Sequence, residues 1–148
     1  MHSLSPFIRM CFNDTTLGFD NSGQSGVVDW QKGDNIQKTF EVLKVMARKY
    51  GAQEYADVVH AIQLINEPIS WGNNKFSVTY QFAIDAYWKV KELTTNKNMQ
   101  IIMHDAFTPL TSWADLPGRT SSRNTDGSNK VGMDAHLYQV CICQYRYP

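Results

Sequence analysis

Segments with helical spacing alternate with short apolar runs along this sequence, and that alternation limits the folds open to it. Residues 34–50 and 76–94 each repeat apolar side chains every three to four positions, the spacing of an amphipathic helix. The runs at 57–68, 100–107 and 131–140 are rich in apolar residues and have the length of buried strands. The order predicts an α/β chain in which right-handed crossovers build a parallel sheet.

Signals at the helix ends support the two helical segments. The first has Asp34 as a predicted N-cap and Gly51 just past its end, and its apolar stripe comprises Ile36, Phe40, Leu43, Ala47 and Tyr50. The second stripe comprises Phe76, Tyr80, Ala83, Tyr87 and Val90. A long polar loop is expected at 108–130, with a short helix near 113–116. A doubly wound sheet and part of a (β/α)8 barrel both fit this pattern.

The composition favours one globular unit over residues 1–148, because 43% of the residues are hydrophobic. Fourteen basic residues balance fourteen acidic ones, so neither nucleic acid nor an anionic membrane is an expected partner. No apolar stretch approaches the roughly 20 residues of a transmembrane helix, and no signal peptide is expected in "MHSLSPFIRM". The three cysteines, Cys11, Cys141 and Cys143, predict neither a closed disulfide framework nor a four-ligand zinc site.

Polar residues end each apolar run, where the carboxyl edge of a parallel sheet would gather them. They are Asn66 and Glu67, His104 and Asp105, and then Asp134, His136 and Tyr138 at alternate positions of the third run. In either architecture the loops at this edge build the functional site. Taken alone, Glu67 has two readings: a general acid in a partly desolvated cleft, or a glutamate held in a salt bridge.

Four strings occur in a distinctive order: "GFDNSGQSGVVDWQ", "AIQLINEP", "QIIMHDAF" and "MDAHLYQV". Together, over residues 17–140, they resemble the fungal exo-β-1,3-glucanases of glycoside hydrolase family 5. The Asn-Glu-Pro tripeptide is shared by many retaining glycosidases, whereas the four strings in this order are much more specific. The resemblance implies a partial (β/α)8 barrel that holds roughly strands 4 to 6 and their flanking helices.

The resemblance also implies roles for single residues. Glu67 corresponds to the proton donor, which later acts as the base that activates water, and Asn66 to the amide that binds the sugar 2-hydroxyl. His136 and Tyr138 correspond to a pair that projects into the sugar pocket. Asn21 and Phe19 correspond to residues of the pocket wall and entrance.

The implied activity is hydrolysis of β-1,3-glucan from its non-reducing ends by a retaining mechanism, without a metal or organic cofactor. An extracellular or cell-wall location and a monomeric complete enzyme are expected from the same resemblance. The residues that choose between β-1,3 and β-1,6 linkages, and between exo and endo action, lie largely outside this stretch. Both alternatives therefore stay open.

The two ends of the chain, residues 1–16 and 141–148, depart from the family pattern. A whole barrel needs around 250 residues, and the family's nucleophile is expected on a later strand. No nucleophile is therefore predicted within this chain, and we expect it to be inactive by itself. Asp105 and Asp134 are the alternatives for an inverting partner. A non-catalytic carbohydrate-binding remnant and a non-functional truncated gene product are the other interpretations.

Overall fold

Two helices and four short strands alternate along the described part of the chain. The computed structural model describes residues 7–9, 30–114, 116 and 131–136. Its elements in order are β1 (Phe7–Arg9), α1 (Asn35–Tyr50), the short 3-10 helix η2 (Gln53–Tyr55), β2 (Ala61–Gln63), α2 (Phe76–Leu93), β3 (Gln100–His104), the 3-10 helix η3 (Leu110–Trp113) and β4 (Val131–Asp134).

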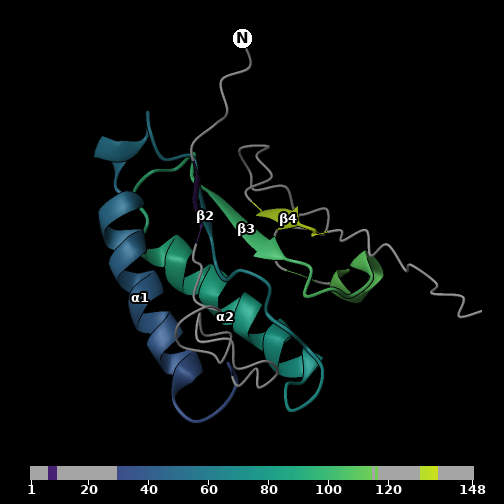
Figure 1. Cartoon of the computed structure of the whole chain (residues 1–148). Coiled ribbons are helices and arrows are strands. Elements are labelled where there is room, and N and C mark those ends of the chain that lie inside the picture. Colours follow the sequence, from purple (N-terminus) through teal and green to yellow (C-terminus); the bar gives the residue numbers. More distant parts are fainter. Residues whose placement is uncertain (1–6, 10–29, 115, 117–130, 137–148) are drawn as a thin grey trace, which may run out of the picture.

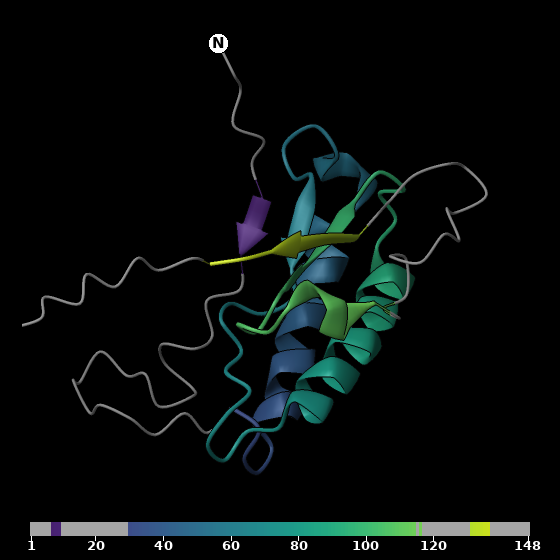
Figure 2. The same ribbon diagram turned by 90° about the vertical axis from the view of Figure 1, so that its right-hand side faces the viewer.

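The four strands form one sheet in the sequential order β1-β2-β3-β4, and every neighbouring pair is parallel. The register places Ile62 opposite Ile101, and His104 opposite Asp134. Both long helices lie on the same side of the sheet (Figures 1 and 2). The predicted α/β chain with a parallel sheet is therefore confirmed, and its carboxyl edge carries the ends of β2, β3 and β4.

The core lies between the two helices and the helix-facing side of the sheet. Phe82 of α2 packs against Phe40 of α1, with ring centroids 5.2 Å apart, and against the fully buried Trp30, 5.5 Å away. Leu43 and Ala86 are also completely or almost completely removed from water. Burying side chains of this size contributes about 1.5–3 kcal/mol each, so this cluster holds the helix pair on the sheet.

Both helix predictions are correct to within one residue. Gly51 ends α1, and its N–H donates to the Ala47 carbonyl over 3.0 Å. A Cβ at position 51 would lie 2.3 Å from that same oxygen, which explains the glycine. Asp34 precedes α1 as predicted, but its carboxylate pairs with Lys38 at 2.9 Å and makes no capping hydrogen bond. Among the described residues, neither helix has the length and apolar character required to cross a membrane.

The strands are shorter than the sequence pattern predicted. The run at 100–107 is strand only to His104, because Ala106 and Phe107 take left-handed backbone angles, with φ of +54° and +57°. The run at 57–68 pairs only over 61–63, and the run at 131–140 forms β4 over 131–134, its last four residues lying outside the described ranges. The strand β1 falls within the divergent first 16 residues and was not predicted.

Candidate active site

Two of the predicted site residues meet at the carboxyl edge of the sheet. Nδ1 of His136 lies 2.6 Å from Oε1 of Glu67, although 69 positions separate the two residues. Asn66 precedes Glu67 in the same loop and is partly buried. Both Glu67 and His136 lie beyond the strand ends on which the sequence placed them, since β2 ends at Gln63 and β4 at Asp134. The predicted site residues Phe19, Asn21 and Tyr138 lie outside the described residues.

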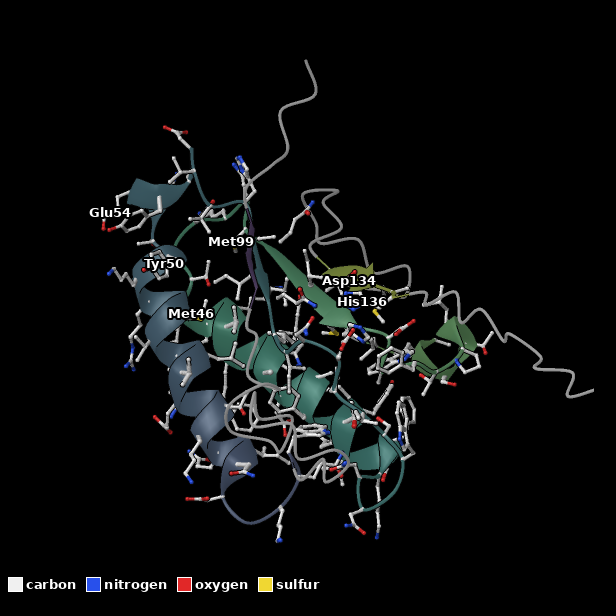
Figure 3. The ribbon with its side chains drawn as sticks, viewed as in Figure 1. Met46, Tyr50, Glu54, Met99, Asp134 and His136 are labelled. Atoms are coloured by element: carbon white, nitrogen blue, oxygen red, sulfur yellow. The ribbon has the colours of Figure 1, made fainter. Side chains whose placement is uncertain are left out.

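A second carboxylate holds the other side of the His136 ring. Nε2 of His136 lies 3.2 Å from Oδ2 of Asp134, and the two side chains lie together at the end of β4 (Figure 3). The same Asp134 oxygen accepts a hydrogen bond of 3.0 Å from Nε2 of Gln63. Gln63 is fully buried on β2, so this bond reaches across β3 to β4. Asp134 and His136 thus lie on one face, as their alternate spacing predicted.

The two contacts of His136 restrict where protons lie. Oδ2 of Asp134 accepts a hydrogen bond from Gln63, which favours a hydrogen on Nε2 of His136 in the contact between His136 and Asp134. At 2.6 Å, Nδ1 and Oε1 of Glu67 share a further hydrogen, since two facing lone pairs would repel. The ring nitrogen of His136 and the carboxyl oxygen of Glu67 are both able to hold that hydrogen. One transferable proton therefore lies between the two groups.

The loop that carries Glu67 is held in place by the helix layer. Nε1 of the buried Trp30 donates to the Ile69 carbonyl over 2.8 Å, and the Ser70 hydroxyl lies 2.8 Å from that of Thr79 on α2. Within this loop Glu67 has φ +46°, a left-handed conformation that is unfavourable for a residue with a side chain. Such conformations persist where the surrounding structure enforces them, and they are frequent at functional sites.

The turn after β3 is built from side chains that cap its backbone. The Ala106 N–H donates to Nδ1 of His104 over 2.9 Å, and the Phe107 N–H donates to Oδ1 of Asp105 over 2.9 Å. These two bonds hold the left-handed pair Ala106 and Phe107. The Phe107 ring then lies against His104, with centroids 5.1 Å apart.

His104 is a neutral, buried neighbour of the Glu67–His136 pair. The residue is 1% exposed, and its ring meets the His136 ring edge to face, with centroids 4.5 Å apart. Burial lowers the pKa of the His104 imidazole, and the Asp105 carboxylate opposes this shift. Because Nδ1 accepts the Ala106 N–H, the ring hydrogen is on Nε2, which has no hydrogen-bond partner among the described residues. The site therefore contains one uncharged histidine beside one that shares a proton.

This lowered pKa predicts a pH-dependent stability. Unfolded His104 takes up a proton as the pH falls through about 6.5, whereas the folded residue does so only at lower pH. The unfolded state then binds more protons, so we expect the free energy of unfolding to fall as the pH drops below about 6.5. His104→Asn keeps an acceptor for the Ala106 N–H but does not titrate, and it should flatten this dependence. Urea unfolding between about pH 5 and pH 7.5 measures the difference.

The matched control is His60→Asn, since His60 is an exposed histidine just before β2. It should keep the pH dependence of the unmodified chain. An equal pH dependence in His104→Asn and the unmodified chain would contradict the assignment of this effect to His104.

Glu67, His104 and His136 form a possible metal-binding group, because one ligand atom from each lies within 4.8 Å of the others. A metal ion needs a free lone pair from each ligand. In the tautomer set by Ala106, however, Nδ1 of His104 already accepts a hydrogen bond and Nε2 holds the ring hydrogen. Both nitrogens of His136 face carboxylates. The arrangement fits a proton-sharing network better than a metal ion.

The sequence placed His104 at the functional edge without giving it a role, and Gln63 was not predicted as a site residue. The available signal for Gln63 was a polar residue within the apolar run "AIQLI", because a buried amide requires a hydrogen-bond partner. The signal for His104 was its position at the end of an apolar run, the same signal that selected Glu67.

Comparisons with known proteins support the predicted resemblance. The chain is 38% identical over 123 residues to a glucan 1,3-beta-glucosidase of Blumeria graminis, an alignment that covers 83% of this chain and 26% of that protein. It is 34% identical over 123 residues to glucan 1,3-beta-glucosidase 1 of Schizosaccharomyces pombe, with 83% and 28% covered. The match to glucan 1,3-beta-glucosidase I/II of Saccharomyces cerevisiae is also 34% over 123 residues, with 83% and 26% covered.

The chain spans about a quarter of the length of these curated relatives. No protein-family model matches it. The chain is a homologue of a segment of the fungal glucan 1,3-beta-glucosidases, which confirms the resemblance to fungal exo-β-1,3-glucanases predicted from the four strings.

Proposed function

We propose that this chain is part of the catalytic domain of a β-glucan hydrolase, and that it supplies the general acid of the site. The single observation that carries this proposal is the 2.6 Å contact between Glu67 and His136, which provides a proton at the carboxyl edge of a parallel sheet. The side chain of Glu67 is 28% exposed, so a sugar can reach it. The names of the relatives support β-1,3-glucan as the substrate.

In the proposed reaction Glu67 donates its proton to the glycosidic oxygen as the bond to the leaving sugar breaks, and later takes a proton from water. His136, held by Asp134 and Gln63, orients the Glu67 carboxyl group and shares that proton. Asn66 binds the sugar 2-hydroxyl, an interaction that strengthens in the transition state. Phe19, Asn21 and Tyr138 complete the sugar pocket in this proposal.

The architecture we propose is a slice of a (β/α)8 barrel. The sequential strand order supports it, because a doubly wound sheet reverses its order at a switch point. Two helices on one side of four parallel strands also fit a barrel wall (Figure 2). In such a barrel, the sheet face that carries Gln63 and Asp134 would line the interior, with His136 just beyond the end of β4.

The retaining mechanism requires a second carboxylate about 5–5.5 Å from the first. Asp134 and Asp105, the alternatives for an inverting partner, suit neither that role nor the role of nucleophile. Asp134 is held by Gln63 and His136, and Asp105 holds the Phe107 N–H. We propose that the nucleophile comes from a part of the same enzyme outside these 148 residues. We also propose that the enzyme is extracellular or bound to the cell wall.

Two assays on the purified chain test the proposal. Calorimetric titration with laminaritriose should show saturable binding, with the α-linked maltotriose as a control that should not bind. Incubation with laminarin should release no glucose, because the nucleophile is supplied elsewhere. Glucose release that disappears in Glu67→Gln would mean that both the general acid and the nucleophile lie within this chain. It would contradict the proposal that the nucleophile comes from elsewhere in the enzyme. Absence of laminaritriose binding would contradict the proposed function itself.

A further inference from the structure

The loop after Glu67 presents an exposed tryptophan beside the proton-sharing pair. Trp71 is 56% exposed, whereas Trp30 and Trp113 are fully buried. Its ring lies against Phe107, with centroids 5.6 Å apart and planes inclined by 59°. Phe107 contacts His104, and His104 contacts His136. A continuous series of ring contacts therefore leads from the Glu67 carboxyl group outward to Trp71.

The backbone around Trp71 is fixed before any ligand binds. Ile69 and Ser70, the two residues before it, are held by Trp30 and Thr79 with contacts of 2.8 Å each. After it, the Asn74 N–H donates to the Trp71 carbonyl over 3.1 Å. An indole that is presented on a fixed loop loses little conformational entropy when it binds a ligand.

The aromatic partner of Trp71 is held just as firmly. Phe107 has φ +57°, and its N–H is bound by the Asp105 carboxylate. A left-handed residue with a side chain is strained and persists only where the structure enforces it. The turn after β3 and the loop after β2 thus direct two aromatic rings to the same place at the carboxyl edge.

From this geometry we propose that Trp71, supported by Phe107, stacks on a glucosyl unit of a bound β-glucan, beyond the unit next to Glu67. This inference rests on the proposed function. The ring faces are apolar and suit the C–H face of a pyranose, which polar side chains do not. The exposed position at the end of the series of rings places this contact outside the reaction centre. A stacking contact at Trp71 therefore predicts that the affinity for an oligosaccharide rises with its length.

The test compares laminaribiose with laminaripentaose by calorimetry on the purified chain. The pentaose should bind about tenfold more tightly than the biose, in line with one aromatic stacking contact. Trp71→Ala should remove this difference and leave the biose affinity unchanged. The matched control is Trp88→Ala, because Trp88 is 54% exposed but lies on α2. It should leave both affinities unchanged.

A spectroscopic measurement locates the contact. Laminaripentaose should change the tryptophan fluorescence of the unmodified chain and of Trp88→Phe, and should not change that of Trp71→Phe. An unaltered preference for the pentaose in Trp71→Ala would overturn this inference and leave the proposed function intact. If the unmodified chain bound neither oligosaccharide, both the inference and the proposed function would fail.

Discussion

Replacing Trp113 with alanine is expected to lower the free energy of unfolding by about 3–5 kcal/mol, the usual range for a buried tryptophan. Trp113 is fully buried and packs on Phe76 and Tyr80, with centroids 5.1 and 5.6 Å away. Its Nε1 donates to the Asp105 carbonyl over 3.0 Å and to the Thr108 hydroxyl over 2.8 Å. The side chain therefore ties the turn after β3 to the start of α2. Since whole domains are stable by about 5–15 kcal/mol, the loss is a large fraction of the total.

Urea unfolding followed by far-UV circular dichroism measures this loss. Trp113→Phe keeps a ring in the same space but loses the N–H, and should cost about 1 kcal/mol. Trp88→Ala removes an exposed tryptophan and should stay within about 0.5 kcal/mol of the unmodified chain. A Trp113→Ala variant as stable as Trp88→Ala would mean that the turn after β3 is not packed on α2 as described.

Replacing His136 with alanine is expected to weaken laminaritriose binding by about 10- to 100-fold. A hydrogen bond to a charged group contributes about 1.5–3 kcal/mol, and the ring contacts two carboxylates, those of Glu67 and Asp134. Without the ring these partly buried carboxylates face each other with no N–H group between them. Glu67 then loses the orientation that the sugar requires.

Calorimetry measures this change, and a circular dichroism melt confirms that the variant is folded. The matched control is His60→Ala, because His60 is exposed and lies at the opposite, amino edge of the sheet, just before β2. It should bind laminaritriose as the unmodified chain does. Equal affinities for His136→Ala and His60→Ala would show that the imidazole at 136 takes no part in binding.

The helices could be predicted closely from the sequence, and the strands only in part. The spacing of Phe40, Leu43 and Ala47 follows directly from a helix with one buried face, and Gly51 marks its end. The apolar residues of 100–107 continue past the end of β3, but two residues with left-handed backbone angles end the strand. Apolar periodicity carries no information on backbone angles. β1 consists of only three residues and depends on pairing with β2, a tertiary contact.

The meeting of Glu67 and His136 was predictable because parallel strands place their carboxyl ends at one edge. The contacts that fix the geometry of these two residues could not be predicted. The bond from Gln63 to Asp134 joins residues 71 positions apart, and no local pattern encodes such a partner. The neutral state of His104 likewise depends on a turn whose backbone N–H reaches back to the ring.

A nuclear magnetic resonance titration with laminaritriose tests most directly whether the group at position 67 faces a sugar. The imidazole signals of His136 and the backbone amide signal of Glu67 should shift together and saturate at one concentration, while the signals of His60 stay unchanged. Saturable binding that moves only signals away from the carboxyl edge, or a titration that moves none, would contradict this expectation.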